Sequence, residues 1–401
     1  MLDSASQEAQ RTGRSTVPIL APIGARLAAL RGKERVQRWR WVAFPFTLWA
    51  VTRVAILGFG KLSMTLAPDL VQSGELHRGY LLRYSSVEGL CRWDCSFFRD
   101  LANSGYVHEG YTNFFPLYPM LVRALHEVTG LPIDLCLILV PNLAALGGLL
   151  VLYRLVTFLE DEAAARWTLL LFISFPFAFF QAMAYPESLM VLFTALAVYL
   201  ALRGRHLWAG VALGVGVLAR HLSFFAGGSL LVAQLKQRPS VRRFLLGPAL
   251  LGLLIPWLFL GAYCAYQYVR FGDAFAFVRM RDNWGPLAWW GVIDWWRSEP
   301  RPNAVMGSYV VFALPSVAAA IASLFRRRWW ELAGFSVPML LVLFHSGIWG
   351  MGRYTASCWA AFVPLGVWLS RRPLLQTPVV MSFALLQGMM FYLVQHQFSI
   401  L

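Results

Sequence analysis

Long apolar segments separated by short polar ones run through the chain from about residue 42 onward. A helix that crosses a bilayer needs about 20 apolar residues, and buried helices can be shorter. The pattern therefore predicts an all-α polytopic membrane protein with about eleven transmembrane helices. Eight of them are expected at about residues 42–66, 132–158, 168–183, 189–202, 208–219, 222–235, 244–268 and 374–394. The other three follow one another through the sequence between residues 304 and 372.

Basic residues gather in four short connections between these segments. They are "RGR" at 203–205, "KQRPSVRR" at 236–243, "RRR" at 326–328 and "SRR" at 370–372. Short loops rich in Lys and Arg remain on the cytoplasmic side of a membrane. The predicted topology places these connections in the cytoplasm, together with a basic N-terminal arm at 1–41. Residues 42–401 then form a single membrane domain with a first outer loop at 67–131, which carries interfacial helices, and a second at 269–304.

Composition agrees with a membrane protein and argues against nucleic-acid binding. The 401 residues are 58% hydrophobic and 14% charged, whereas soluble domains carry about 25% charged residues. The net charge is +15, but the basic side chains fall in short loops and not in a patch interleaved with aromatic residues. We expect them to contact anionic membrane lipids.

The cysteines do not suggest a disulfide framework. There are five, an odd number, and most lie in apolar segments. They are Cys91, Cys95, Cys136, Cys264 and Cys358. Cys91 and Cys95 resemble half of a metal site, but no C-x-x-C or nearby His pair completes it.

The stretch "CRWDCSFFRDLANSGY", residues 91–106, is unusually polar for this chain. Three of its apolar residues follow the spacing i, i+4, i+8 and predict an amphipathic interfacial helix. They are Trp93, Phe97 and Leu101. Asp94 is expected at the edge of that apolar face. It is either solvated, paired locally with Arg92 or Arg99, or functional, because a charge near lipid is costly.

"RWDCSFFRDLANSGY" followed by "NFFPLYPMLVRAL" resembles the first outer loop of the GPI mannosyltransferase II (PIG-V) family and its bacterial relatives, which are GT-C integral membrane glycosyltransferases. Further matching pieces come in the expected order over roughly residues 40–370. They are "YPESLMVLFTALAVYLALRGRHLWAGVALGVGVLAR", "FGDAFAFVRMRDNWG" and "GMGRYTASCWAAFVPLG". The basic arm is not part of the family pattern.

The resemblance implies a GT-C fold and transfer of a sugar, usually mannose, from a polyprenyl- or dolichyl-phosphate donor with inversion. Trp93 and Asp94 match the Trp-Asp pair of the family, whose acidic position is taken as catalytic. The likeness to bacterial forms implies the inner (plasma) membrane, with the active site on the extracytoplasmic face. Since bacteria make no GPI anchors, we expect a lipid or an envelope glycan as the acceptor.

The chemistry needs one base. A carboxylate at Asp94 can take the proton of the acceptor hydroxyl as that hydroxyl attacks the sugar. A lipid phosphate leaves unaided, so a second carboxylic acid is not required, unlike in glycoside hydrolysis. Trp93 is expected to contact the substrate beside this base.

The departing phosphate favours cations nearby. Four candidates lie in predicted outer segments, and they are Arg220, His221, Arg353 and His345. Arginine can hold phosphate oxygens through two hydrogen bonds. Two alternatives stay open: Arg220 extends to lipid headgroups, or Arg353 is a simple membrane anchor.

Glu187 in "AYPESL" is a second acidic candidate, for acceptor binding or for orienting the site. Alternatively, Pro186 begins a helix and Glu187 only occupies its first turn. A divalent ion held by Asp94 with His108 and Glu109 is conceivable but not favoured, because so few ligands at loop spacing are weak evidence.

Two outer segments carry weaker signals. Pro116 and Pro119 predict a bent entry to a short interfacial helix. The Trp residues of the second outer loop form an interface belt or a surface that stacks on sugars.

A transporter or flippase of lipid-linked substrates is the alternative from another class. It predicts charges along a path through the membrane, whereas here they gather in outer segments. A different donor sugar, or a non-catalytic partner of a glycosyltransferase, also remains open.

Overall fold

The computed structural model describes residues 23–66, 88–237, 240–280, 304–346 and 350–396, and also residues 293 and 297. The regular elements within these ranges are all helices. The chain divides into two compact units, Met1–Ala43 and Phe44–Leu401. In the first unit, helix α1 (Ile23–Leu66) begins within the predicted N-terminal arm, and it continues into the second unit.

The second unit is built mainly from apolar helices. Besides α1 they are α4 (Ile133–Leu159), α5 (Glu162–Ser174), α6 (Glu187–Leu202), α7 (His206–Ala219), α8 (Ala226–Lys236), α10 (Pro248–Phe271), α13 (Ala304–Leu324), α14 (Trp330–Ser346), α16 (Trp359–Ser370) and α17 (Pro373–Gln395). Among the described residues, five stretches are long and apolar enough to cross a membrane. They are Trp41–Ser63, Ile133–Leu159, Pro248–Phe271, Gly307–Leu324 and Pro373–Gln395. The prediction of an all-α polytopic membrane protein is confirmed.

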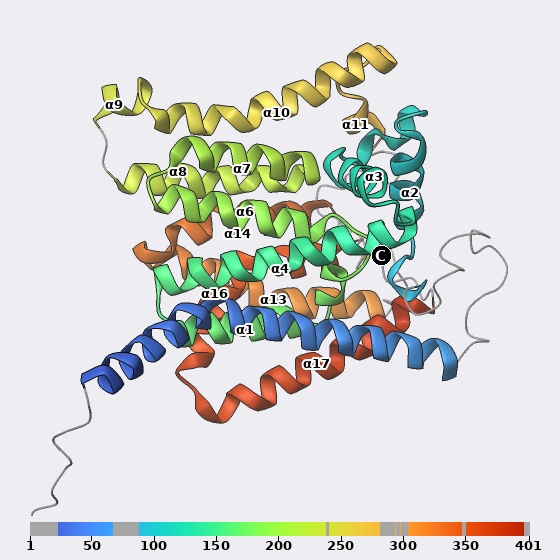
Figure 1. Ribbon diagram of the computed structural model, residues 1–401. Helices are drawn as coiled ribbons and strands as arrows, with labels where there is room; N and C mark the ends of the chain where they lie inside the picture. Colours follow the sequence, from blue (N-terminus) through green and yellow to red (C-terminus); the bar gives the residue numbers. More distant parts are fainter. Residues whose placement is uncertain are drawn as a thin grey trace, which may run out of the picture. The chain divides into compact units, whose positions relative to one another are not determined.

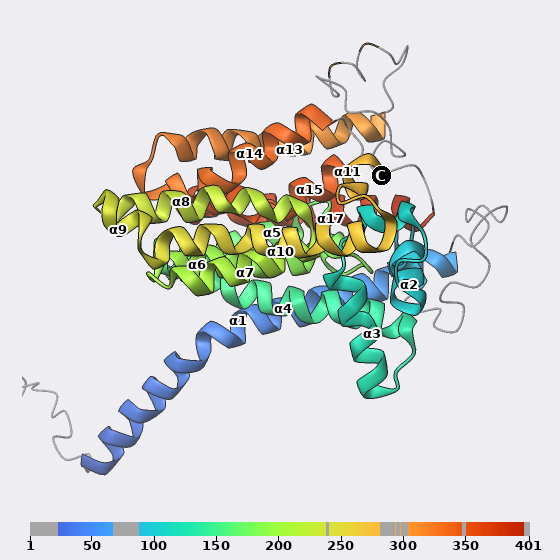
Figure 2. The ribbon, with the colours of Figure 1, turned by 90° about the horizontal axis from the view of Figure 1, so that it is seen from above.

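Shorter elements connect these helices. They are the α-helices α2 (Cys95–Ser104), α3 (Leu117–Thr129), α9 (Val241–Leu245), α11 (Ala276–Arg279) and α15 (Met351–Ser357), and the 3-10 turns η2 (Glu88–Leu90), η3 (Glu109–Asn113), η4 (Ala178–Gln181), η5 (His221–Phe225) and η7 (Arg327–Trp329). Figures 1 and 2 place α2, α3 and α11 together at one end of the long helices. The α6–α7, α13–α14 and α16–α17 connections and α9 lie at the opposite end.

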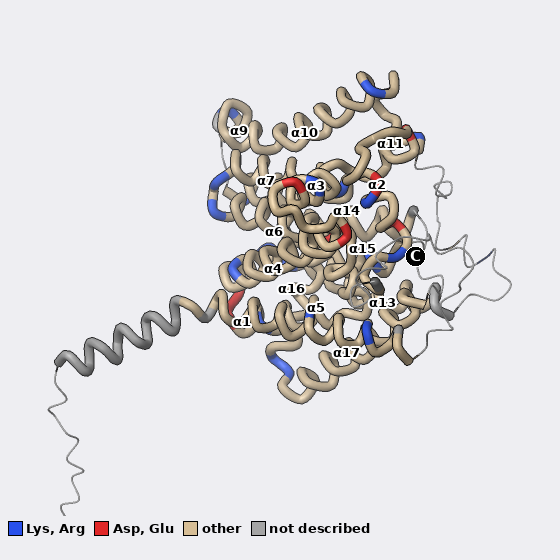
Figure 3. The backbone as a smooth tube through the Cα atoms, turned by 45° about the vertical axis from the view of Figure 1, so that its right-hand side comes forward, with Lys and Arg blue, Asp and Glu red and all other residues tan. Residues whose placement is uncertain are grey.

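Charged residues lie mostly near the helix ends. In Figure 3 the bodies of the long helices are largely tan, and α10 is tan over most of its length. This distribution is expected of helices surrounded by hydrocarbon, where an unpaired charge is costly. Close packing inside the unit uses small residues, because a Cβ built on Gly210 of α7 would lie 2.2 Å from the carbonyl oxygen of Gly252 on α10.

The predicted helix at 168–183 is displaced in the structure. Helix α5 begins at Glu162, because the side chain of Asp161 accepts a hydrogen bond of 2.7 Å from the backbone N–H of Ala164. The helix ends at Ser174, so the predicted residues up to 183 are not part of it. The acidic residues Asp161 and Glu162, which precede the predicted helix, therefore lie at the start of α5.

The connection between α5 and α6 lies in the core of the second unit. Its aromatic side chains are at most 1% exposed, and they are Phe175, Phe177, Phe179, Phe180 and Tyr185. The ring of Phe175 packs against Phe362 of α16, and the ring of Phe179 packs against Phe391 of α17. This packing fixes the start of α6, and with it the position of Glu187.

Candidate active site

Asp94 lies directly before α2, in a turn whose backbone is held from several sides. Its N–H donates to Tyr185 Oη at 3.2 Å, and that hydroxyl donates to the carbonyl of Arg92 at 2.8 Å. Trp93 has φ +57°, in the left-handed region. A bulky residue adopts this conformation at a cost of about 1–2 kcal/mol, so other contacts must hold the turn.

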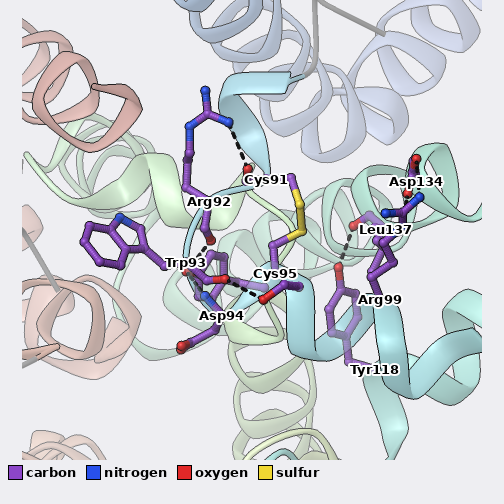
Figure 4. The surroundings of a disulfide bond; sticks show 11 residues. Cys91, Arg92, Trp93, Asp94, Cys95, Arg99, Tyr118, Asp134 and Leu137 are labelled. Atoms are coloured by element: carbon purple, nitrogen blue, oxygen red, sulfur yellow. Dashed lines mark hydrogen bonds and ion pairs between the residues drawn. A yellow bond between two sulfur atoms is a disulfide. The ribbon is translucent and has the colours of Figure 1, made fainter. Parts of the chain in front are cut away.

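A disulfide between Cys91 and Cys95 closes this turn (Figure 4). The cysteine pattern did not predict this bond, because it suggested no disulfide framework and only half of a metal site at these two residues. The number of cysteines in the chain does not show which two lie close together. The turn at Trp93 brings Cys91 and Cys95 to a Cα–Cα distance of 5.3 Å. Disulfides usually form at about 4.4–6.8 Å.

The predicted apolar face of this helix also needs correction. Helix α2 begins at Cys95, so Trp93 precedes it and does not share a face with Leu101. The buried side of α2 is instead formed by Cys95, Ser96, Phe98, Leu101 and Ala102. Trp93 is 38% exposed, and in Figure 4 its indole extends away from the disulfide. Asp94 occupies the N-cap position, not the edge of a helical face.

Arg353 of α15 joins Asp94 to a second carboxylate. Its Nη1 lies 3.0 Å from Asp94 Oδ2, and its Nε lies 3.4 Å from Glu187 Oε1. The side chain of Arg353 is 8% exposed and that of Asp94 is 14% exposed. Neither side chain is freely solvated, and both belong to one ionic network.

Arg220 completes this network from the turn between α7 and η5. Its Nη1 lies 3.3 Å from Glu187 Oε1, and the Glu187 side chain is fully buried. Tyr354 accepts hydrogen bonds from Arg220 and, at 3.1 Å, from Arg353. We call Asp94, Glu187, Arg220, Arg353 and Tyr354 the ionic cluster.

The cluster contains two carboxylates and two guanidinium groups, so their formal charges cancel. Burying an ion pair is costly unless the charges are well matched, and removing one partner leaves an uncompensated charge. Burial disfavours the charge on Arg353, but Tyr354, Glu187 and Asp94 outweigh this and raise its pKa above the usual value. Burial also opposes ionisation of Tyr354, yet Arg220 and Arg353 outweigh it and lower the pKa of that phenol.

Direct ion pairs thus join four of the predicted site residues into one chain of contacts, namely Asp94, Arg353, Glu187 and Arg220. The alternative that Arg220 extends to the headgroups does not fit its pairing with Glu187. His221 follows Arg220 in sequence, but it is exposed and its ring lies 5.6 Å from that of Phe115. His345 is half-buried near the end of α14.

The residues weighed for a metal site do not join Asp94. Glu109 forms an ion pair with Arg279 of α11, and the ring of His108 lies 6.0 Å from that of Tyr111. Within the described ranges, no three His, Cys, Asp or Glu side chains form a group that could hold an ion. The Trp-rich part of the second outer loop lies outside the described residues, apart from Ile293 and Arg297.

Sequence reasoning missed the two tyrosines of this site. Tyr185 holds the Asp94 turn, and its ring lies 5.1 Å from the guanidinium carbon of Arg353. Tyr354 lies between the two guanidinium groups. The available signal was adjacency, because each tyrosine stands within two residues of a predicted site residue in "AYPES" or "GMGRY".

The fold is that of the GT-C membrane glycosyltransferases. The structure of ArnT from Cupriavidus metallidurans bound to undecaprenyl phosphate superposes with a TM-score of 0.54. The sequence identity is 14%, and the alignment covers 86% of this chain and 75% of that chain. At this identity the similarity establishes the fold alone.

The family-level likeness comes from the sequence. Residues 61–236 match the family model Mannosyltransferase (PIG-V). GPI mannosyltransferase 2 of Drosophila pseudoobscura pseudoobscura is 29% identical over 113 residues, which cover 26% of this chain and 25% of that relative. The predicted resemblance to PIG-V mannosyltransferases is thereby confirmed over this part of the chain. Asp94, Glu187 and Arg220 fall inside the matched segment, and Arg353 lies beyond it.

Proposed function

We propose that this protein is a membrane glycosyltransferase that moves a sugar, expected to be mannose, from a polyprenyl-phosphate donor to a hydroxyl of an extracytoplasmic lipid or envelope glycan. The ionic cluster is the observation that carries this proposal. It combines a carboxylate for a proton with two guanidinium groups for a phosphate, in a GT-C fold with likeness to PIG-V mannosyltransferases. The undecaprenyl phosphate bound to ArnT supports a lipid phosphate as the carrier.

In the proposed reaction, Asp94 removes the proton of the acceptor hydroxyl. That oxygen forms a bond to the anomeric carbon, and the bond from this carbon to the phosphate oxygen breaks, so the configuration inverts. The electron pair of the broken bond goes to the lipid phosphate. The carboxylate of Asp94 becomes neutral while the phosphate gains one negative charge, so the total charge is unchanged.

Arg353 can link these two charge changes. It pairs with Asp94 while that group is a carboxylate, and protonation of Asp94 removes this attraction. We propose that the guanidinium then turns to the phosphate oxygens, which it can hold through two hydrogen bonds. Arg220 supplies the second cation from the other side of Tyr354.

Glu187 is proposed to orient the site. Its carboxylate is fully buried and pairs with both arginines, so it can fix where they point. A site built on restrained side chains requires little reorganisation during the reaction. Trp93, which is partly exposed beside Asp94, is proposed to contact the sugar or the acceptor.

The site is proposed to face the extracytoplasmic side of a bacterial plasma membrane. The cluster lies near α2, at the end of the helices opposite the basic connections around α6–α7 and α16–α17 (Figure 1). Short basic connections favour the cytoplasm, and the opposite end then faces outward.

The test uses purified protein in liposomes, radiolabelled polyprenyl-phosphate-mannose, and a membrane lipid extract of the producing organism. We expect Asp94→Asn to lower the transfer rate by about 100- to 10,000-fold, the usual contribution of a general base. Asp100→Asn, the same change at an aspartate of α2 outside the ionic cluster, is the matched control and should retain activity. Equal rates in wild type and Asp94→Asn would remove Asp94 from the mechanism.

The same vesicles test the alternative of transport. Movement of the labelled donor across the bilayer without a new glycosidic bond would favour a flippase. Transfer only from another polyprenyl-phosphate sugar would keep the reaction class and change the sugar.

A further inference from the structure

The disulfide encloses the three residues Arg92, Trp93 and Asp94 and no others. These include the proposed base and the residue with the left-handed backbone. A cross-link over so short a loop constrains little of the unfolded chain, because the stabilising effect of a disulfide grows with loop length. Its main effect is therefore expected on the local path of the backbone.

We propose that the Cys91–Cys95 disulfide is a positioning device that keeps Trp93 in its left-handed conformation and thereby holds the Asp94 carboxylate against Arg353. This inference rests on the proposed function of Asp94 as a base. It assigns the two cysteines a role in the rate of the chemical step, without direct contact with substrate.

The neighbouring contacts show why the turn needs this link. Arg92 is 4% exposed, and its Nε donates to the carbonyl of Gln395 on α17 at 3.1 Å, which anchors one side of the turn. Phe98 of α2 is buried and packs against Tyr185, which anchors the other side. Between these anchors, Trp93 could relax to an ordinary helical conformation, and the direction of the Asp94 side chain would then change.

The proposal also limits where the site can work. Disulfides persist in oxidising compartments and are rare in the cytosol. A base that depends on this link acts on the outer side of the membrane, in agreement with the proposed orientation. Cys136 and Cys358 are buried free thiols, and Cys264 is a half-buried free thiol on α10.

The first test compares wild type with Cys91→Ala/Cys95→Ala in the transfer assay, with Cys264→Ala as the matched control. We expect kcat to fall about 10- to 100-fold, the effect of misplacing a catalytic group by about 1 Å. The fall in kcat should exceed any rise in KM, because an interaction made only in the transition state is lost, while the shift of Trp93 affects substrate binding less. Unchanged kcat, or a rise in KM alone, would overturn the proposal.

Reduction of the folded protein guards against a variant that fails to fold. Dithiothreitol gives two electrons and two protons to the disulfide, which becomes two thiols while the reagent forms its own cyclic disulfide. We expect wild type to lose activity on reduction and regain it on reoxidation, with no response in the double alanine variant. Loss of activity in both proteins alike would count against the proposal.

A third measurement does not depend on activity. Trypsin cleaves after Arg83, Arg92 and Arg99, so the disulfide should join peptides 84–92 and 93–99, and Asp94 is the single carboxylate of the second peptide. After reduction, modification of Asp94 by a water-soluble carbodiimide should become several-fold faster, while Asp100 serves as an internal reference. Separate peptides in unreduced protein, or equal labelling before and after reduction, would overturn the inference even if wild type transfers sugar.

Discussion

The two ends of the helices both contain buried acids, but they pair them differently. At the end near α9, Lys236 of α8 lies 2.7 Å from Glu331 of α14, and Lys236 is 24% exposed while Glu331 is 3% exposed. At the other end, Arg353 contacts two carboxylates and Glu187 contacts two guanidinium groups. The first arrangement joins two helices through a single ion pair. In the second, Arg353 and Glu187 each contact two groups of opposite charge.

Shared partners have a consequence that a single pair lacks. When one contact of the ionic cluster is lost, the remaining groups can re-pair, because each guanidinium has another acceptor nearby. A single pair such as Lys236–Glu331 offers no such exchange and serves to fasten α8 to α14. The comparison therefore separates a region suited to moving charge from one suited to stability, and variants at both ends can test it.

The largest effect is expected for Arg353→Gln. This change removes a partner from Asp94 and from Glu187 at once, in a site where Arg353 itself is 8% exposed. Breaking a buried pair costs about 3–5 kcal/mol, and transfer should fall at least about 100-fold. Thermal unfolding in detergent and the transfer assay measure the two effects. A loss of stability no larger than that of Lys236→Met would contradict the expected difference between the two ends of the helices.

A smaller loss is expected for Glu187→Gln, which keeps the shape and removes the charge. Arg353 retains Asp94 as a partner, but Arg220 loses the carboxylate at 3.3 Å. We expect about 3 kcal/mol of lost stability, at the lower limit for a broken buried pair. Glu162→Gln, at a carboxylate that is 45% exposed, is the matched control. Equal melting temperatures for the two variants would show that burial at Glu187 has no special effect.

Lys236→Met should affect stability but not transfer. It leaves the carboxylate of Glu331, which is 3% exposed, without its cation. The expected cost is about 1–3 kcal/mol, because Lys236 is itself partly solvated. The kcat should stay within about twofold of wild type, since no step of the reaction uses this pair. A large fall in kcat at unchanged stability would mean that the two ends are coupled.

The smallest effect is expected for Arg166→Gln on α5. Arg166 pairs with Glu162 one helical turn away, and both side chains are about half exposed. Such pairs contribute about 0.3–0.5 kcal/mol. The melting temperature should shift by little, and raising the salt concentration should remove the difference from wild type. A shift in melting temperature as large as that of Lys236→Met would mean that the solvent exposure of an ion pair does not determine its contribution to stability.

The helices were largely predictable because their cause is local. The segment at 132–158 corresponds to α4, and the segment at 374–394 corresponds to α17. Hydrophobic length determines such helices wherever the rest of the chain lies. The prediction failed at 168–183, where an N-cap at Asp161 moved the start, and at Trp93, whose left-handed backbone put it outside α2.

The types of site residue were also predictable, since a charged side chain in an apolar membrane protein is costly and is usually paired or functional. Their partners were not. Asp94 and Arg353 are 259 residues apart in the sequence, and no periodicity relates them. Tyr185 and Tyr354 carried no signal of their own, because tyrosines are common at membrane interfaces.

The sequence by itself determined the class of this protein and the residue types available for its chemistry. Apolar length, basic connections and the ordered family motifs are properties of neighbouring residues, and they persist in any arrangement of the helices. Only the tertiary structure decided that α2, α6, α15 and the turn at Arg220 meet, and that a disulfide closes the turn that holds Asp94. Ionic contacts act over a few ångströms in space, so they depend on the packing of distant segments.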